Sequence, residues 1–367
     1  TELLEDIKTF SLILSDPDVL KSVIRTELIE TQETYGDARR TEIVEFYSDL
    51  TDEDLIPEED LIVTLSKEGY AKTQPLDSYQ AQNRGGTGKR AASLKDEDFV
   101  SKLFVANTHD TLLCFSSYGK VYWIKVYRLP RGGRNAKGRP IVNLLPLEKD
   151  ERIQAVLPVK EFNDDQFIFM ATETGSVKKT KLSAYSRPMK SGIKAIKLRD
   201  GDRVVNAEIT DGSKEIMLFS NSGKSIRFKE TDARPMGRVS QGVRGMRIEK
   251  EQKIISLVVL EEGNILVATE NGYGKQTLKD QFSTQKRGGK GVIAIQTSER
   301  NGSLIGANQV STGDEVMFIS ASGNLIRTRT DDISVIGRNT QGVRLIRLSD
   351  DDNLLGMEKV ITEEDAE

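Results

Sequence analysis

Short apolar runs alternate with glycine-containing turns along most of the chain, and the same order of elements recurs six times. Each repeat begins with a β-rich run, reaches a turn that ends in glycine, and continues into a second β-rich run; in the last repeat, Val316 to Ser322 precede Gly323. We call these six residues the turn glycines, and they are Gly69, Gly119, Gly175, Gly223, Gly272 and Gly323. Their separations of 50, 56, 48, 49 and 51 residues indicate an array of one supersecondary unit.

A second glycine follows each turn glycine, 19 residues later in five repeats and 17 residues later in the third. It opens a third apolar run, as Gly242 does for residues 243–248. The turn between the first two runs suits a hairpin whose glycine adopts a positive φ. Each repeat therefore predicts four strands, which in the last repeat are expected at about 315–320, 324–329, 342–348 and 354–360.

Four short strands in a unit of about fifty residues are typical of a propeller blade, which cannot bury its apolar faces alone. The prediction is an all-β, six-bladed, propeller-like domain over residues 61–349, with four strands per blade. An open β-solenoid is the structural alternative, although its coils are usually shorter than these repeats.

The first 48 residues have a different pattern, because their apolar residues recur at helical spacing with charged residues between them. Asp16-Pro17 is a typical helix start, so a short α-helical segment of two helices is expected over 1–48. Residues 49–60 are predicted to be an acidic linker, and residues 350–367 to hold the last strand and an acidic tail.

The shortness of the apolar runs and the scarcity of cysteine and histidine argue against a membrane protein and against a metal or catalytic site. No run approaches the roughly 20 apolar residues of a bilayer span, and no signal pattern opens the chain, so we expect a cytoplasmic protein without membrane contact. The single cysteine, Cys114, and the single histidine, His109, do not form a metal-ligand set. Cys114 is interpreted as a small buried hydrophobe, and neither a catalytic residue nor a cofactor is expected in this chain.

The net charge of −4 conceals a strong segregation of charge. Residues 1–60 carry 18 acidic and 5 basic side chains, and residues 350–367 carry 8 acidic and 1 basic. The residues between them therefore have a surplus of 16 positive charges, which is typical of a protein that binds a polyanion.

Basic side chains recur at corresponding points of the repeats, after the turn glycines and around the second glycines. In a ring these points lie at equivalent heights, so the sequence predicts a curved basic surface that follows a phosphate backbone without reading bases. Two loops also hold paired glycines, at 82–88 and 285–291. The predicted DNA-binding residues are Arg84, Gly85, Gly86, Lys89, Arg90, Lys120, Arg134, Lys137, Arg139, Lys178, Lys179, Lys181, Lys190, Arg227, Lys229, Arg238, Arg244, Lys275, Lys286, Arg287, Gly288, Gly289, Lys290, Arg327, Arg329, Arg338 and Arg344.

The two glycine-rich loops and three further segments are similar to those of a known family. Residues 82–88 resemble the GyrA box, a Gln-basic-Arg-Gly-Gly-basic-Gly motif of the DNA gyrase A C-terminal domain, and the segments 105–110, 138–147 and 337–343 also match that family. The box departs from the motif at its two flanking basic positions, where this chain has Asn83 and Thr87; residues 285–291 keep the full pattern. Which of the two loops dominates DNA wrapping is therefore left open.

The resemblance implies a β-pinwheel, a propeller relative whose blades exchange strands, with double-stranded DNA wrapped around its rim. It also implies that the catalytic tyrosine and the cleavage core precede this region in the same polypeptide. Gyrase B would be a partner in an A2B2 heterotetramer, ATP and magnesium would act elsewhere in the holoenzyme, and the protein would be found at the bacterial nucleoid.

Three other functions are weighed against DNA wrapping. The equivalent C-terminal domain of topoisomerase IV is the nearest alternative, since its box is typically degraded. A propeller that scaffolds proteins would present apolar or mixed-charge patches, which the basic surplus argues against. A propeller enzyme would gather carboxylates in its central channel, whereas the acidic residues here cluster in linkers and turns.

Overall fold

The computed structural model of the protein describes residues 2–37, 39, 41, 52–66, 69–75, 100–133, 136–322, 325–348 and 352–360. The chain forms two compact units, Thr1–Asp52 and Glu53–Glu367. The first contains the two predicted helices, α1 (Glu2–Ser15) and α2 (Pro17–Tyr35). Asp16 caps α2 by accepting a hydrogen bond from the backbone N–H of Asp18, so the predicted helix start is confirmed. Among the described residues, no helix has the length and apolar character needed to cross a membrane.

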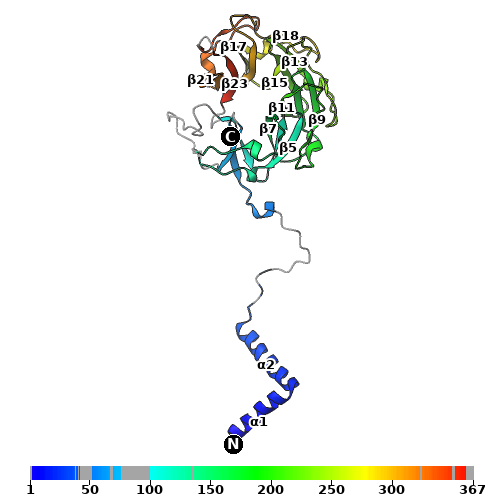
Figure 1. The fold of residues 1–367 in the computed structure, drawn as a ribbon, viewed down its shortest axis with the longest axis vertical. Helices are drawn as coiled ribbons and strands as arrows, with labels where there is room; N and C mark the ends of the chain where they lie inside the picture. The colour runs from blue at the N-terminus through cyan, green and yellow to red at the C-terminus, as the bar shows by residue number, and fades with distance from the viewer. Residues whose placement is uncertain are drawn as a thin grey trace. The chain divides into compact units, whose positions relative to one another are not determined.

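The second unit is a six-bladed propeller of antiparallel sheets arranged in a ring (Figure 1), which confirms the predicted fold class. In each repeat the first two strands form a hairpin, and in the first five repeats the described turn glycine lies between its strands. The first strands are β1 (Asp60–Ser66), β4 (Thr111–Ser116), β8 (Phe167–Thr172), β12 (Glu215–Ser220), β16 (Asn264–Thr269) and β20 (Glu315–Ser320). The second strands are β2 (Tyr70–Pro75), β5 (Lys120–Lys125), β9 (Ser176–Lys181), β13 (Lys224–Lys229), β17 (Tyr273–Leu278) and β21 (Leu325–Arg329).

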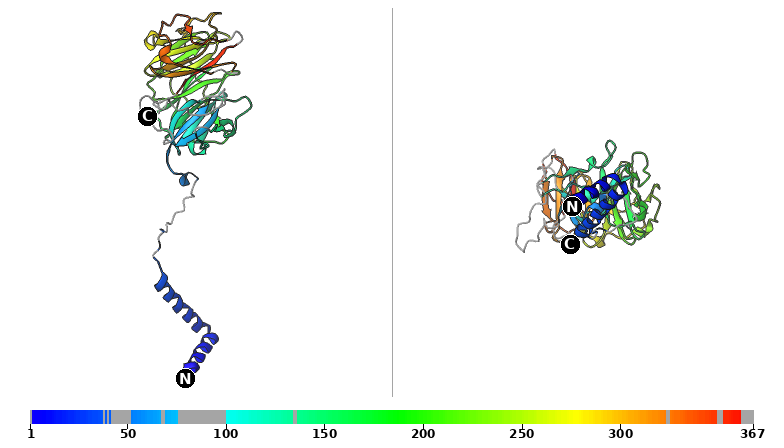
Figure 2. Two further views of the ribbon diagram at one scale, coloured as in Figure 1. Left: turned by 90° about the vertical axis from the view of Figure 1, so that its left-hand side faces the viewer. Right: turned by 90° about the horizontal axis from the view of Figure 1, so that it is seen from below.

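The last strand of each repeat pairs with the first strand and lies at the inner edge of its sheet. These inner strands are β3 (Val100–Asn107), β7 (Ile153–Val159), β11 (Val204–Thr210), β15 (Ile254–Leu260), β19 (Leu304–Val310) and β23 (Leu354–Val360). From β7 to β23 each inner strand contacts the next, and β23 contacts β3. An apolar core shared by the first and second blades completes the circuit. Figure 2 shows the ribbon from the side and from below.

The outermost strand of a blade comes from the following repeat, so the blades exchange strands as the resemblance implied. These outer strands have only two residues each: β6 (Arg139–Pro140), β10 (Ile193–Lys194), β14 (Val243–Arg244), β18 (Val292–Ile293) and β22 (Val343–Arg344). In the second blade the order from inside to outside is β7, β4, β5, β10. The expected strand at 342–348 is therefore corrected in length and partner, because β22 pairs with β17 of the preceding blade.

Short 3-10 turns complete the secondary structure, and most of them follow a second strand. They are η1 (Asp52–Leu55), η3 (Val126–Arg128), η4 (Ile141–Asn143), η5 (Leu182–Tyr185), η6 (Glu230–Asp232), η7 (Lys279–Gln281) and η8 (Thr330–Asp332).

The apolar core lies between neighbouring blades rather than within one blade. Alternate residues of a first strand face opposite neighbours, so Leu112 and Cys114 pack toward the first blade while Leu113 and Phe115 pack toward the third. Both faces are thus buried, which explains the continuous apolar run of β4. Burial raises the pKa of the Cys114 thiol to about 12, and the interpretation of this residue as a buried hydrophobe is confirmed.

Candidate nucleic-acid interface

Five loops cross the outer edge of the ring and lead into or through the outer strands, and we call them the rim loops. They comprise residues 129–139, of which 134 and 135 lie outside the described residues, 186–194, 233–244, 282–293 and 333–344. Together they contain fifteen Lys or Arg residues and no Asp or Glu. The loops themselves therefore contribute charge of one sign, which suits a polyanion.

Backbone hydrogen bonds connect the rim loops around the ring. In three successive repeats, the residue five positions after the second glycine donates its N–H to a carbonyl of the next rim loop. These bonds join Lys197 to Ser240 (3.1 Å), Arg247 to Gly289 (2.8 Å) and Gln296 to Thr340 (2.9 Å). The basic side chains are thus mounted on a connected band of backbone rather than on independent loops.

Most of the predicted residues on the described rim loops are accessible. The exposed ones are Arg139, Lys190, Arg244, Lys286, Lys290 and Arg344, and the partly exposed ones are Lys137, Arg238, Arg287 and Arg338. Lys229, on β13, is also exposed. The rim-loop cations belong to consecutive repeats, and some occupy equivalent positions: Arg238, Arg287 and Arg338 each lie four residues before a second glycine.

The rim loop of the fifth repeat is held by its own arginine. Arg287 donates from Nε to the carbonyl of Asp232 (2.8 Å) and from Nη1 to the carbonyl of Arg244 (3.0 Å). Gly288 has a φ of 83°, and its N–H donates to the carbonyl of Gly245 (2.6 Å). The N–H of Gly288 is therefore engaged within the fold, and the exposed cations of this loop are Lys286 and Lys290.

Three predicted contacts are buried, and their assignment to a DNA surface is wrong. Lys178 and Lys275 have no exposed surface, and Lys179 is 4% exposed. Lys179 forms an ion pair with the fully buried Glu230 (3.1 Å) and lies 4.3 Å from the ring centre of Phe167. The reason is that second strands are packed on both faces, so neighbouring lysines point to opposite interiors.

Burial also changes the acidity of two of these amines. Desolvation, with a smaller contribution from the charge of Arg238, lowers the pKa of Lys178 to about 7. Desolvation, with a smaller contribution from Arg338, lowers the pKa of Lys275 to about 8. Both amines donate to backbone carbonyls of rim loops, so they act within the fold.

Other predicted cations on the second strands form ion pairs with neighbouring carboxylates, although Arg327 and Arg329 share a single glutamate and both remain exposed. Lys120 pairs with Glu148 (2.5 Å) and Lys181 with Asp164 (3.2 Å), while Arg327 and Arg329 both pair with Glu315. Arg227 pairs with Glu215 and donates to the carbonyls of Lys279 and Phe282 (3.0 Å each). With a side chain only 13% exposed, Arg227 is a structural residue of the fourth blade.

Six predicted residues lie outside the described residues, namely Arg84, Gly85, Gly86, Lys89, Arg90 and Arg134. The structure does not test them, and Gly289 also stays a prediction.

Several basic residues on the rim were missed by the predictions from sequence. Arg187 and Arg234 are exposed in rim loops, and Lys197, Arg247 and Arg347 are exposed five residues after a second glycine. Their constant distance from the second glycine was the signal that could have identified the last three.

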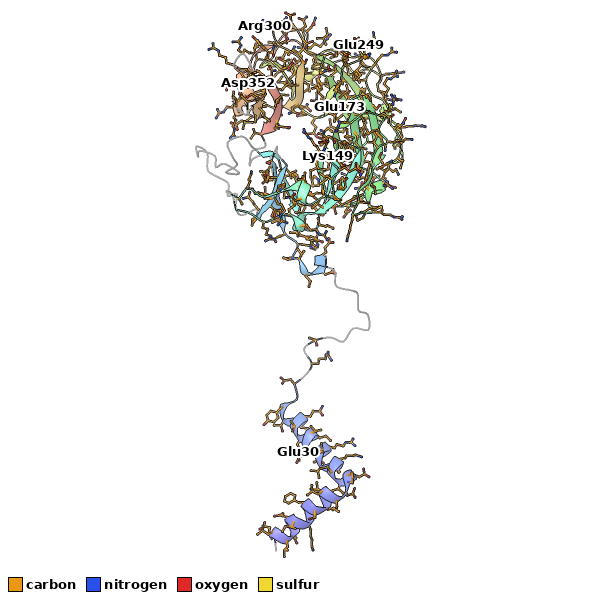
Figure 3. All side chains as sticks on the ribbon, in the orientation of Figure 1. Glu30, Lys149, Glu173, Glu249, Arg300 and Asp352 are labelled. Carbon is orange, nitrogen blue, oxygen red and sulfur yellow. The ribbon has the colours of Figure 1, made fainter. Side chains whose placement is uncertain are left out.

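The hairpin turns on one side of the ring carry mixed charge, in contrast to the rim loops. Glu173 pairs with Lys253 (2.9 Å), and Glu249 lies 3.9 Å from Lys224; both glutamates are labelled in Figure 3. Acidic and basic side chains are thus interspersed here, whereas the rim loops contain no acidic residue.

One rim arginine also contacts an aromatic ring. Arg344 donates from Nη2 to the hydroxyl of Tyr273 (2.9 Å), and the guanidinium of Arg300, labelled in Figure 3, lies 4.9 Å from the same ring centre. Hydrogen bonds from Arg300 and then Arg344 lower the pKa of the Tyr273 hydroxyl. Two cations therefore converge at the point where the last rim loop meets the fifth blade.

Comparison with known proteins identifies the repeats as those of one family. The family described as "DNA gyrase C-terminal domain, beta-propeller" matches residues 60–107, 110–160, 166–211, 214–261, 263–311 and 314–361. These six segments coincide with the six repeats.

Curated relatives of the chain are DNA gyrase A proteins. The Salmonella typhimurium protein is 53% identical over 94% of this chain, and the Haemophilus influenzae protein is 50% identical over 98%. The chain spans about two fifths of the length of these relatives.

Two solved structures share the fold. The C-terminal domain of DNA topoisomerase IV superposes with a TM-score of 0.74 at 27% identity and covers 83% of this chain and 94% of its own. A DNA gyrase A C-terminal domain superposes with a TM-score of 0.63 at 30% identity, and the match covers 83% of this chain and 100% of that domain. The topoisomerase IV domain shares the architecture, but the relatives that are about half identical in sequence are gyrase A proteins.

Proposed function

The chain belongs to the family of DNA gyrase C-terminal β-propeller domains, and from that premise we propose that its rim loops bind duplex DNA without sequence preference, bend it and wrap it with a fixed hand. The observation that carries this proposal is the run of five rim loops with fifteen basic and no acidic residues. Exposed cations such as Arg139, Lys190, Arg244 and Lys286 belong to successive repeats, so a duplex that follows the edge meets a cation in each.

The energetics favour phosphate contacts over base reading. Bending a few tens of base pairs costs on the order of several kcal/mol. Lysines and arginines on the rim offset this cost by releasing condensed counterions from the duplex. Because the loops are joined through backbone hydrogen bonds, their cations are presented on a preformed curve, and little ordering is needed when DNA binds.

Within a complete gyrase, we propose that wrapping presents a neighbouring DNA segment for passage through a break made by the cleavage core. The hand of the wrap would then set the direction of supercoiling. The break, ATP hydrolysis and the magnesium chemistry belong in this proposal to other parts of an A2B2 assembly with gyrase B, acting in the cytoplasm at the bacterial nucleoid.

Ligation of nicked plasmid circles in the presence of the protein tests wrapping directly. After removal of the protein, the circles are expected to show a linking-number change of one sign that grows with protein concentration. Binding without such a change would refute wrapping. A salt titration distinguishes the scaffold alternative: neutralisation of roughly ten phosphates predicts that log K falls with log salt at a slope near −9.

A further inference from the structure

A buried lysine alternates with an apolar or aromatic residue around the ring. The position is the third residue after each turn glycine, on the second strand of the blade. Its occupants in order are Lys72, Tyr122, Lys178, Ile226, Lys275 and Ile326. The first, third and fifth blades therefore place an amine where the others do not.

Each of these amines reaches the rim loop of the next repeat, which lies along the outer edge of the same blade. Lys275 donates to the carbonyls of Gly337 (2.6 Å) and Arg338 (2.5 Å) and to the hydroxyl of Thr340 (2.9 Å). Lys178 donates to the carbonyl of Arg238 and also to that of Ala195 (2.5 Å). The same contact recurs between Lys72 and the carbonyl of Gly133 (3.2 Å).

The acceptors explain why lysine suits this position. A lysine ammonium has three N–H donors and no acceptor, and Lys275 finds three oxygens within 2.9 Å. The buried partner is the amine, and a buried donor that loses its acceptors costs more than an average hydrogen bond gains. The amine therefore selects the loop conformation in which Gly337, Arg338 and Thr340 converge.

The rim loop of the fifth repeat is held differently. Ile226 occupies the equivalent position beneath it, and a Cβ atom added to Gly289 would lie 3.5 Å from the Ile226 Cδ1 atom. There the Arg287 guanidinium supplies the donors, to the carbonyls of Asp232 and Arg244. In the last rim loop the two devices occur together, since Arg338 also donates from Nη1 to the carbonyl of Ile293 (3.1 Å), whereas the loop of the fifth repeat has the arginine above and an isoleucine beneath it.

We propose that Lys178 and Lys275 are positioning residues for the DNA interface, each holding the backbone of the next rim loop so that its arginine, Arg238 or Arg338, is set in place before DNA binds. This inference rests on the proposed function. The two lysines do not touch DNA; their effect on it passes through the arginine whose carbonyl they bind.

Hydrogen exchange without DNA tests whether the lysines hold the loops. In Lys178→Met we expect faster amide exchange in residues 237–241, and in Lys275→Met in residues 337–341, each relative to the unchanged protein. Ile226→Met is the matched control at the same blade position, and it should leave exchange in residues 286–290 unchanged. Unaltered exchange in both folded lysine variants would overturn the proposal; if one variant does not fold, the other decides.

Duplex binding then tests whether the loop acts through its arginine. Removal of one phosphate contact flattens the salt slope by about 0.9, so Lys178→Met and Arg238→Met are each expected to flatten it by up to that amount. The double variant should match Arg238→Met alone, whereas a merely structural lysine would add a separate loss. Additive losses, or a Lys178→Met variant with faster loop exchange and unchanged DNA binding, would overturn the positioning role. If the unchanged protein does not bind duplex DNA, the proposed function fails, and the exchange result still decides whether the lysines hold the loops.

Discussion

Neutralising Lys286 and Lys290 is the cleanest perturbation of the proposed interface. Both are exposed in the rim loop 282–293, one on each side of Arg287 and its glycine pair. Arg287 itself is a poor target, because its guanidinium holds two backbone carbonyls and its loss would change the loop as well as the charge. The double substitution Lys286→Gln and Lys290→Gln removes charge and leaves these hydrogen bonds intact.

The expected magnitude follows from counterion release. Each phosphate contact contributes about 0.9 to the slope of log K against log salt, so the double variant should have a slope flatter by about 1.8. At 0.1 M salt this corresponds to a roughly eightfold loss of affinity for duplex DNA per contact, or about 60-fold for both contacts. Fluorescence anisotropy of a labelled duplex, titrated at several salt concentrations, measures the slope and the affinity together.

A lysine away from the rim provides the control. Lys160 is exposed just beyond the inner strand β7, and Lys160→Gln removes the same charge without touching a rim loop. We expect it to leave the slope unchanged. If the double variant keeps the slope of the unchanged protein, or if Lys160→Gln flattens it equally, DNA does not follow this rim loop and the reasoning is refuted.

Three further predictions concern the fold and its titratable groups. Gly223→Ala should lower the free energy of unfolding by at least roughly 2 kcal/mol, since its φ is 75° and the new Cβ would lie 2.2 Å from the carbonyl oxygen of Ile295. Gly237→Ala is the control, because its Cβ would meet nothing within 4 Å, and it should change the free energy of unfolding little. Chemical denaturation measures both, and equal effects would contradict the argument. Lys178 has a pKa of about 7 in the folded protein against 10.5 in the unfolded chain. Between these pH values the unfolded chain binds one more proton than the folded protein. The free energy of unfolding should therefore rise with pH in this range, by about 1.4 kcal/mol per pH unit from this group. Urea denaturation across that range should show a shallower rise in Lys178→Met, and an identical pH dependence would speak against the buried amine. Cys114, with its pKa raised to about 12, should react with a thiol reagent at pH 8 only when the protein unfolds, so rapid labelling of the native protein would disprove its burial.

The wrong predictions of DNA contacts share one cause. Lys178, Lys179 and Lys275 lie on second strands, and a strand in the middle of a blade has neighbours on both faces. These three lysines lie within the central part of their strands, where both faces are packed, whereas Lys229 at the end of β13 and most cations of the rim loops remain accessible. The sequence locates both kinds of residue only by their distance from a glycine. That distance does not reveal burial, so it could not distinguish the buried Lys178 from the exposed Lys190.

Strand exchange was likewise beyond the repeat pattern. The periodicity assigned the third apolar run to its own repeat, and only the resemblance to a pinwheel family suggested otherwise. In the structure Val343 and Arg344 pair with β17 of the preceding blade. Two residues form too short a strand for any hydrophobic pattern to specify its partner.

By itself, the sequence determined the number of blades, the hairpin in each, the helical start at Asp16-Pro17 and the excess of positive charge, because these depend on local spacing and composition. The tertiary structure decided which cations reach the outer edge and which amines, such as those of Lys178 and Lys275, turn inward to hold a loop. The physical reason is that burial and hydrogen-bond partners are set by the neighbouring blade, which lies about fifty residues away in the chain and against the strand in space.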